Sequence, residues 1–418
     1  MFKIITIVLI SVYFAFNLFL NVLRYTNRNA PIPDELKDVY DQETYLKWKK
    51  YSAERIVLSI VSDSINYVVF LVLLLIDLFA LVTKDITNEY LSAIVVYALY
   101  AATTIVFDVA VEYVRDMKIE DKYGFNKTTM KTFVLDQIKG FVIGNALLIG
   151  LTCLFIAIYN AMHEYTLLLF SGVLFALVLL FAFLYPLFSK VFNKFTSLEE
   201  GELRDGIIKM LESHSYKVRD IKVMDASRRT TKSNAYFTGF GKSKTIVLYD
   251  NLLKAMSNEE ILAVFAHEMG HGLHKDTLKN SLISLLNVLI VVALAWLLVI
   301  FPDIYADFGF SSANYGFAFL LLSTAVMPIV SLLLGFLSSY ISRKAEYRAD
   351  EQAVIEGYGD SLEKALKILA RENFADLNPN RLIVLLEYSH PTLLQRIRAL
   401  EAKRKDPNYS TNHQSLGS

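Results

Sequence analysis

The sequence is poor in cysteine, in proline and in net charge. Its 418 residues include a single cysteine, Cys153, which excludes an intramolecular disulfide, a cysteine-cluster metal site and an iron–sulfur centre. Eight prolines and no low-complexity stretch exclude a disordered scaffold. Forty-two Lys and Arg residues balance forty-two Asp and Glu residues, so the chain lacks the broad basic field that nucleic-acid binding requires.

Hydrophobic residues, by contrast, are abundant. They make up 54% of the chain while charged residues make up 20%, and the mean hydropathy is +0.38. Soluble domains average about 45–50% apolar and about 25% charged residues. The composition therefore predicts an integral membrane protein, with the lipid bilayer as a partner, that also carries some soluble mass.

Seven apolar segments are long enough to cross a bilayer as helices, which takes about 20 residues. They lie at 4–23, 56–83, 90–112, 140–163, 165–189, 280–301 and 308–342. The first is too long for the core of a signal peptide and lacks a small-residue cleavage site, so we interpret it as a retained span. The last exceeds one crossing, which predicts a tilted helix or one that projects beyond the membrane.

Three carboxylates fall inside these segments: Asp63, Asp77 and Asp108. Because a carboxylate that faces lipid is costly, we expect all three to face the interior of the bundle. Two interpretations are equally compatible with the sequence. The carboxylates make buried polar contacts between helices, or they line a water-filled cavity.

The distribution of basic residues predicts the orientation of the spans. The loops at 24–55 and 113–139 carry seven and six Lys or Arg residues, whereas the alternate loops carry only Lys84. Because basic loops stay in the cytoplasm, the N-terminus is expected outside and the polar segments at 190–279 and 343–418 inside. The sequence does not distinguish a bacterial plasma membrane from an endoplasmic reticulum membrane.

The chemistry is concentrated in a predicted helix that begins with a capping box at Ser257 and Glu260. On this helix His267 and His271 lie one turn apart, so their imidazoles can bind one metal ion, and Glu268 can accept a proton from a metal-activated water. The alternative, a solvated helix with surface histidines, is disfavoured by the cap and the apolar run before the motif.

A catalytic zinc site needs a third protein ligand and an open fourth position. His274 follows His267 by seven residues, but an unbroken helix separates the two by about 10 Å, so His274 can serve only if the helix breaks near Gly272. The other source is the pair Glu346 and Asp350, one turn apart, of which one can bind zinc while the other accepts a hydrogen bond from a ligating imidazole. Taken alone, this pair is typical of an ordinary charged helix face.

Two further segments are candidates for substrate contacts. Residues 234–237 and 245–249, with Gly239 and Gly241 between them, predict a β-hairpin whose edge can bind an extended peptide. His390 can donate to the oxyanion of a tetrahedral intermediate, although a histidine before proline is more often a turn residue. The tail after Lys405 is polar and is expected to be disordered.

Motifs along nearly the whole chain resemble those of the zinc-dependent CAAX prenyl endopeptidases, which are integral-membrane gluzincins. They are DVYDQETYLKW at 38–48, KYGFNKTT at 122–129, PLF at 186–188, NKFT at 193–196, SNAY at 233–236, HEMGH at 267–271, EYRAD at 346–350 and SHP at 389–391. Two positions depart from the family, which has an aromatic residue and a histidine where this chain has Gly272 and Asp276.

The resemblance implies a mainly α-helical protein whose seven transmembrane helices surround a water-filled chamber, with a cytosolic α+β gluzincin-like zinc peptidase domain. It implies that His267, His271 and Glu346 bind one Zn²⁺ and that Glu268 acts as the base, assisted by His390. It also implies that Asp350 and Arg396 support the metal site and that Asn234, Ala235 and Tyr236 hold the substrate.

These observations predict a zinc-dependent membrane endopeptidase of the kind that removes the C-terminal tripeptide of prenylated proteins. The expected division is residues 1–194 with five spans, and residues 195–418 as a peptidase domain interrupted by two spans at about 280–342. One alternative is a quality-control metalloprotease that cleaves misfolded membrane proteins. A second is a seven-helix receptor or transporter with a structural zinc site, which the three rather than four evident ligands disfavour.

Overall fold

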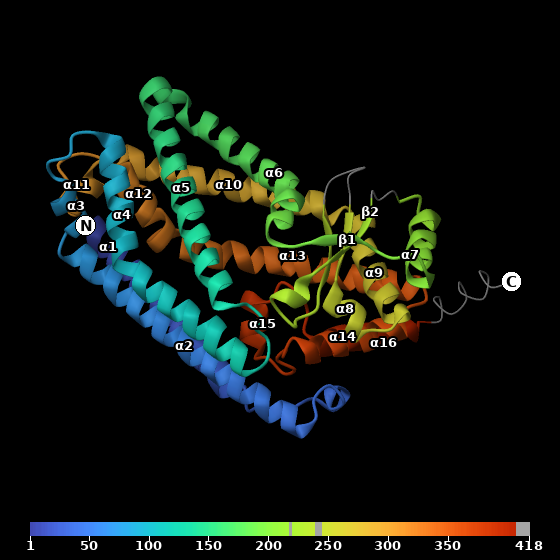
Figure 1. Ribbon diagram of the computed structural model, residues 1–418. Helices are drawn as coiled ribbons and strands as arrows, with labels where there is room; N and C mark the ends of the chain where they lie inside the picture. The colour runs from blue at the N-terminus through green and yellow to red at the C-terminus, as the bar shows by residue number, and fades with distance from the viewer. Residues whose placement is uncertain (217–219, 239–244, 407–418) are drawn as a thin grey trace.

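The computed structural model of the protein describes residues 1–216, 220–238 and 245–406, and of residues 182–183 and 185–192 it describes the backbone alone. Long helices form an elongated bundle at one end, where the N-terminus lies, and a small sheet with shorter helices forms the other end (Figure 1). The turn predicted at Gly239 and Gly241 and the tail from residue 407 lie outside the described residues.

The first part of the bundle contains helices that begin at polar caps. Asp41, Asn88 and Thr129 each accept a hydrogen bond from the backbone N–H three residues later, which satisfies a donor that a helix start leaves unpaired. The elements in chain order are α1 (Phe2–Asn27), a 3₁₀ turn (Asp34–Leu36), α2 (Gln42–Leu75), α3 (Leu78–Thr83), α4 (Glu89–Glu112), a π-helical segment (Tyr113–Glu120), α5 (Met130–Met162), a 3₁₀ turn (His163–Tyr165) and α6 (Thr166–Phe192).

The remaining membrane helices follow the first part of the soluble end. They are α10 (Asp276–Ile300), the short α11 (Asp303–Asp307), and a long helical stretch made of α12 (Tyr315–Leu321), a π-helical segment (Leu322–Val326) and α13 (Met327–Ile355). α13 passes from the bundle directly into the soluble end (Figure 1).

Six stretches of the described chain are long and apolar enough to span a membrane. One of them, Met130–Phe181, contains α5 and α6, which run in opposite directions on either side of the turn at His163–Tyr165 (Figure 1). In each of these six stretches, at most 33% of the most apolar 18-residue segment is buried inside the protein. Most of this apolar surface is therefore available to lipid. The protein is thus a mainly helical membrane protein.

The prediction that Asp77 lies inside a span and faces its interior is wrong. The helix breaks there, because Asp77 adopts a left-handed conformation (φ 52°) between α2 and α3. Its side chain is 39% exposed and pairs with Lys3 Nζ at 2.7 Å. Asp63 does lie within α2, where Asn21 Nδ2 of α1 donates to it at 3.3 Å, as expected for a polar contact between helices.

The soluble end is built on a mixed sheet. Its described strands are β1 (Phe195–Ser197), β2 (Asp220–Met224), β3 (Ala235–Thr238) and β4 (Thr245–Tyr249), in the order β1-β2-β4-β3. β2 and β4 are parallel, while β1 and β3 run antiparallel to their neighbours. The predicted hairpin of β3 and β4 is confirmed, with Ala235 opposite Leu248.

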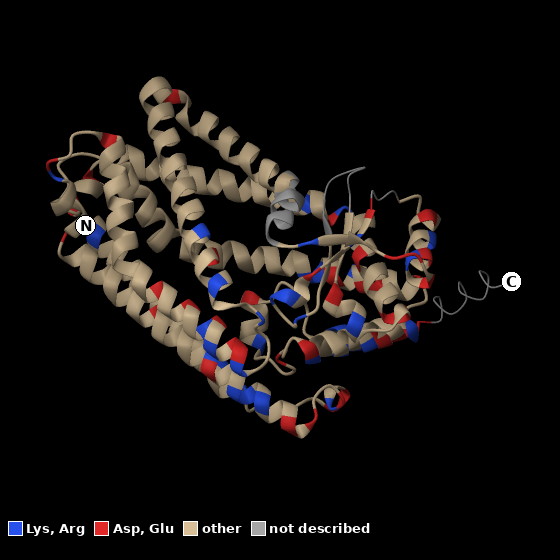
Figure 2. Ribbon diagram, in the orientation of Figure 1, with Lys and Arg blue, Asp and Glu red and all other residues tan. Residues whose placement is uncertain are grey.

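Short helices surround this sheet. They are α7 (Glu202–Ser213), a 3₁₀ turn (Ala226–Arg228), α8 (Asp250–Ala255), α9 (Asn258–Leu273), α14 (Gly359–Glu372), α15 (Arg381–Glu387) and α16 (Leu393–Arg404). α9 lies at the centre, and its apolar residues from Ile261 to Ala266, together with Met269, are buried in the core of this end. Charged residues are frequent at the soluble end and at the adjoining end of α2, and sparse along the rest of the bundle (Figure 2).

α9 and α13 share the most extensive helix contact of the described structure. Gly270 of α9 lies against Ala349 of α13, and a Cβ at Gly270 would approach the Ala349 Cα to 2.9 Å. The absence of a side chain at Gly270 therefore allows the two helix backbones to approach each other. This packing brings the motif at 267–271 next to the motif at 346–350.

Candidate metal centre

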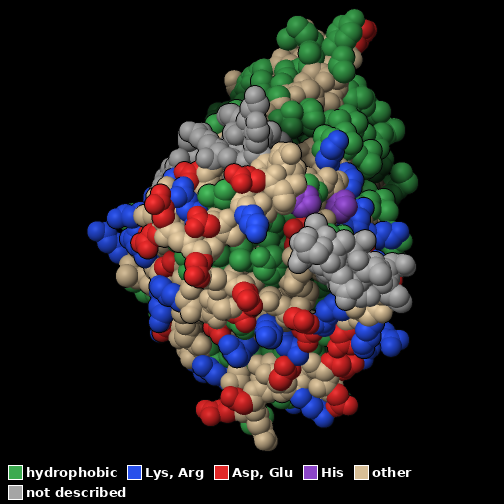
Figure 3. Space-filling model, turned by 90° about the vertical axis from the view of Figure 1, so that its right-hand side faces the viewer, with side chains coloured by type: hydrophobic (Ala, Val, Ile, Leu, Met, Phe, Trp, Pro, Cys, Tyr) green, Lys and Arg blue, Asp and Glu red, His purple; other side chains and the backbone are tan. Residues whose placement is uncertain are grey.

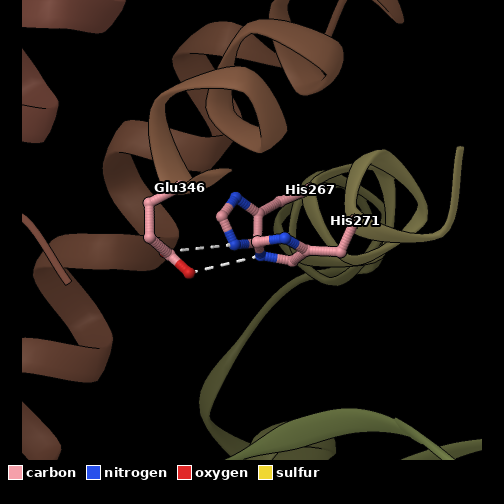
Figure 4. Close-up of side chains that lie close together, drawn as sticks. All are labelled: His267, His271 and Glu346. Atoms are coloured by element: carbon pink, nitrogen blue, oxygen red, sulfur yellow. Dashed lines mark ion pairs between the residues drawn. The ribbon is translucent and has the colours of Figure 1, made fainter. Parts of the chain in front are cut away.

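The motif at 267–271 lies on a helix that starts as predicted. Ser257 accepts a hydrogen bond from the Glu260 backbone N–H, and the Glu260 carboxylate accepts one from the Ser257 N–H at 2.8 Å. This capping box fixes the first turn of α9 and with it the rotation of the helix. As a result His267 and His271 face the same neighbour, α13, from successive turns (Figure 4).

Glu346 of α13 points at both histidines (Figure 4). Its Oε1 lies 3.2 Å from His271 Nε2, and its Oε2 lies 3.6 Å from His267 Nε2. One nitrogen of each histidine and one carboxylate oxygen lie within 4.8 Å of one another. The structure thus brings together the three residues that the sequence suggested as metal ligands.

The donor set fits a metal ion. Glu346 Oε2 is buried and, within the described part of the chain, makes no hydrogen bond, which is costly unless a cation satisfies it. Two imidazole nitrogens and one carboxylate, with an open fourth position, are the ligand set of catalytic zinc sites. Burial lowers the pKa of His271, but hydrogen bonds to Glu346 and Asp276 outweigh it and raise this pKa to about 9. The pocket therefore favours a positive charge.

Two carboxylates orient the histidines from behind. Asp350 Oδ1 lies 2.9 Å from His267 Nδ1, and Asp276 Oδ2 lies 3.0 Å from His271 Nδ1. Each contact leaves the Nε2 atom directed at Glu346 and fixes the tautomer of the ring. Of the pair that the sequence offered, Glu346 lies with the two histidines and Asp350 lies at Nδ1 of His267.

Asp276 was not assigned a role from the sequence, which marked it only as a departure from the resembled family. α9 ends at Leu273, and Lys275 adopts a left-handed conformation (φ 55°) before α10 begins. This break turns Asp276 back toward His271, where Lys279 Nζ and Arg348 Nη2 also hold its Oδ1 at 3.0 Å. The sequence offered one signal for this contact, an acidic residue that follows the second histidine shortly after the helix ends.

His274, the other candidate for the third ligand, is exposed at the C-terminal end of α9 and is not part of the cluster of His267, His271 and Glu346. The helix does end near Gly272, as that alternative required, but His274 caps its end and the chain turns only at Lys275. The break therefore places the side chain of Asp276, and not that of His274, beside the second histidine.

Arg396 connects α16 to the cluster. Its Nη2 lies 2.5 Å from Asp350 Oδ1 and its Nε lies 2.9 Å from Asp350 Oδ2, while Nη1 lies 3.6 Å from Glu346 Oε2. A two-pronged contact of this kind fixes both the arginine and the carboxylate. Arg396 thus supports the residue that orients His267.

Glu268 and His390 lie at the same cluster. Burial raises the pKa of Glu268, an effect that His267 and His271 oppose. A raised pKa brings a carboxyl group closer to the range in which it can both accept and return a proton. His390 Nε2 lies 3.3 Å from Glu346 Oε1, and its side chain is 65% exposed. Histidine side chains are visible at the surface of this end of the protein (Figure 3).

The three predicted substrate residues lie on and beside β3, which is an edge strand of the described sheet and packs beside α9. Asn234 is exposed, its carbonyl accepts a hydrogen bond from the Tyr249 N–H at 3.1 Å, and Tyr236 lies opposite Val247. In an antiparallel ladder the main-chain groups of successive residues point alternately toward the partner strand and away from it. Since the Asn234 carbonyl points toward β4, the main chain of Ala235 faces the outer edge of the sheet. There the Ala235 N–H donates to Asn234 Oδ1 at 2.9 Å.

Comparison with known proteins gives consistent matches over the chain. Residues 21–194 match the CAAX prenyl protease N-terminal family of five membrane helices, and residues 197–404 match peptidase family M48. The chain is 30% identical to CAAX prenyl protease 1 of Saccharomyces cerevisiae, over 93% of this chain and 92% of that protein. It is also 30% identical to a CAAX prenyl protease 1 homolog of Arabidopsis thaliana, over 94% and 96%.

Among solved structures, the crystal structure of Ste24p from S. mikatae superimposes with a TM-score of 0.88 at 29% sequence identity. The match covers 96% of this chain and 99% of that one. The likeness therefore extends through both the helical bundle and the soluble end.

Proposed function

Because this chain belongs to the CAAX prenyl protease family of M48 metallopeptidases, we propose that it removes the C-terminal tripeptide of prenylated proteins with one bound Zn²⁺. The observation that carries the proposal is the convergence of His267, His271 and Glu346 next to Glu268. A structural zinc site is normally closed by four protein ligands, whereas this cluster offers three. The arrangement favours catalysis.

The mechanism uses the groups around the cluster. The chemistry that zinc supplies when bound is Lewis acidity, which polarises a carbonyl group and acidifies an attacking water. Glu268 accepts the proton of that water and returns it to the leaving amine, a double role that its raised pKa favours. His390 donates a hydrogen bond to the oxyanion of the tetrahedral intermediate. Asp350, Asp276 and Arg396 keep the ligand side chains in place.

The outer edge of β3 is the proposed binding site for the substrate main chain. A peptide in extended conformation can add to an edge strand by main-chain hydrogen bonds. It would pair with Ala235, whose N–H is bound by the Asn234 side chain in this structure. Binding therefore requires that Asn234 release this N–H and turn its amide toward the peptide. Tyr236, the next residue of β3, is the third residue that we propose to contact the substrate.

The arrangement in the membrane is also part of the proposal. We infer seven crossings, because α5 and α6 are separated by a turn within one 52-residue apolar stretch. The excess of basic residues in the loops at 24–55 and 113–139 supports a cytoplasmic location for the metal centre and its α+β peptidase domain. The helices at 1–194 and the peptidase part at 195–418, interrupted by the last two spans, then enclose a chamber open to substrate.

The test uses the full-length protein and a peptide with a prenylated cysteine three residues from its C-terminus. Release of the tripeptide is measured by mass spectrometry. We expect Glu268→Gln to retain zinc and to lose activity by about 10²–10⁴-fold, because only the general base is removed. Glu259→Gln, which changes an exposed glutamate in the first turn of α9, serves as the matched control and should cleave like the parent.

Two results would contradict the proposal in different ways. If Glu268→Gln binds zinc and cleaves as fast as the parent, the assignment of the base is wrong. If the unmodified peptide is cleaved as efficiently as the prenylated one, the prenyl group is not recognised, and the protein then acts as a quality-control protease.

A further inference from the structure

A groove of about 740 Å³ runs along α13 where this helix leaves the bundle. α13, the segment at 377–381, α15 and the first turn of α16 form its walls. We call it the basic groove and define it by Tyr340, Arg343, Lys344, Tyr347, Arg381 and Arg398. None of these residues is one of the three candidate metal ligands, although Tyr347 directly follows Glu346 in the chain.

The basic groove carries an uncompensated positive charge. Four of its defining residues are cationic, and no Asp or Glu is among its described lining residues. Among the contacts of the described residues, Arg398 alone is neutralised, by Glu35 Oε1 at 2.6 Å. Arg343 donates to the backbone carbonyls of Val384 and Tyr388 at 3.2 and 2.6 Å, which fixes the guanidinium but leaves its charge.

The two remaining cations are accessible. Lys344 lies 4.6 Å above the ring of Tyr340, and both Lys344 and Arg381 are exposed. Within the described part of the chain, neither forms an ion pair. An anion in the groove can therefore reach the two side chains without breaking an existing salt bridge. Arg343 lies fixed beside them.

The basic groove faces away from the metal centre. Helical residues rotate by about 100° each, so Tyr340 lies on the opposite side of α13 from Ala349, nine positions later, which packs against α9. By the same rotation Lys344 and Tyr347 lie on the side of Tyr340. The groove thus opens to the outside of the bundle and not to the side of the histidines.

The same face of α13 continues into the bundle as an exposed apolar stripe. Leu333 and Leu337 are 67% and 54% exposed, and Tyr340 is 48% exposed. Along this face the side chains change from aliphatic to tyrosine to lysine and arginine. This order is typical of a helix that passes from the hydrocarbon core through the interface to water, because amphipathic rings and long cations sit at the level of the headgroups.

We propose that the basic groove binds an anionic phospholipid. Its phosphate lies between Lys344 and Arg381, next to the fixed guanidinium of Arg343, and an acyl chain follows Leu333 and Leu337. Arginine matches the geometry of phosphate oxygens, and clustered cations beside a membrane helix favour anionic headgroups. A zwitterionic lipid gains less, because its ammonium group is repelled by the same three cations, Arg343, Lys344 and Arg381.

The test is native mass spectrometry of the full-length protein in detergent, titrated with phosphatidylglycerol or with phosphatidylcholine. We expect phosphatidylglycerol to bind more tightly, and the double variant Lys344→Glu, Arg381→Glu to weaken its binding by about tenfold or more. Lys364→Glu, which reverses an exposed lysine on α14, is the matched control and should leave binding unchanged. The melting temperature of each variant shows that it folds.

Three results would overturn the proposal. Equal binding of the two lipids would mean that charge does not select the occupant. An unchanged affinity of the double variant, or an equal loss in Lys364→Glu, would mean that lipid binds elsewhere. Displacement of phosphatidylglycerol by inorganic phosphate at comparable concentration would assign the groove to a soluble phosphate compound and not to lipid.

Discussion

Individual contacts of Asp276 explain how this chain holds His271. The carboxylate lies 3.0 Å from His271 Nδ1 and is itself held by Lys279 and Arg348. A carboxylate behind a ligating imidazole fixes the ring and increases its basicity, and its loss typically weakens metal binding by about 10–100-fold. We therefore expect Asp276 to act on a bound metal ion through the histidine.

For Asp276→Asn we expect zinc affinity to fall by about 10–100-fold, because the amide no longer stabilises the ligating tautomer of His271. The measurement is competition with a coloured chelator. Asp303→Asn changes the first residue of another helix, α11, and should bind zinc like the parent. An unchanged affinity in Asp276→Asn would show that His271 needs no carboxylate partner.

Asp376, in the segment between α14 and α15, makes stability depend on pH. Burial raises its pKa to about 6, against the opposing effect of a hydrogen bond from the Asn378 N–H. Between about pH 4 and pH 6 the folded state therefore binds more protons than the unfolded chain, and stability falls as pH rises through this window. At neutral pH the ionised carboxylate costs up to about 3 kcal/mol.

Asp376→Asn should therefore raise the melting temperature at pH 7.5 and change it little at pH 4.5, because the amide carries no charge to bury and can still accept from Asn378. Thermal unfolding in detergent at both pH values measures the difference. Asp121→Asn, at an exposed position, provides the comparison. The same shift at both pH values would show that ionisation of Asp376 does not cause the effect.

At the scale of residues, the structure brings His267 and His271 together as their spacing in the sequence predicts. The two histidines and Glu268 are recognisable because one helical turn separates the ligands. Asp276 was missed because its role depends on a left-handed residue, Lys275, and not on a helical period. Asp77 was misplaced because a carboxylate within an apolar run can also mark the point where the helix breaks.

At the scale of elements, the site depends on the packing of α9 on α13. The two ligands of α9 and the third of α13 meet only because Gly270 lets the helices approach. The sequence predicted both helices, but it did not predict their contact, which joins segments about 80 residues apart in the chain. From the residues alone, the pair Glu346 and Asp350 was one of two candidate sources of the third ligand, and the resemblance to a family assigned that role to Glu346.

Gly270→Ala should destabilise the protein by about 1–3 kcal/mol and weaken zinc binding, because the new Cβ would clash with the Ala349 backbone and push Glu346 away from the histidines. Thermal unfolding and zinc titration report the two effects. Gly335→Ala on α13 is the control, since a Cβ there has no atom within 4 Å. If both variants behave alike, the close approach of α9 and α13 is not required.

At the scale of the whole molecule, the composition and the apolar segments were enough to predict a helical membrane protein. The alternative of a receptor or transporter with structural zinc is answered by membership in a metallopeptidase family. Orientation and the number of crossings remain predictions, because hydropathy alone does not divide the stretch Met130–Phe181. The basic groove was not visible in the sequence, because its cations come from three separate helices.

Removal of the metal should lower the melting temperature of the entire protein, because a bound ion links α9 to α13. At a free zinc concentration about 1,000 times the dissociation constant, the stabilisation amounts to about 4 kcal/mol. Unfolding is compared with excess chelator and after zinc is restored, and His271→Ala should not respond to either. If the chelated protein has lost its metal but unfolds at the same temperature, the ion does not link the helices.

The continuity of α13 has a practical consequence for biochemistry. Glu346 is carried on the same unbroken helix, Met327–Ile355, whose first half lies in the apolar bundle. A fragment limited to the soluble end would either truncate α13 or retain the apolar first half of this helix without its packing partners. Detergent or lipid is therefore a condition for assembling the catalytic machinery, and purification protocols that dispense with both should yield inert protein.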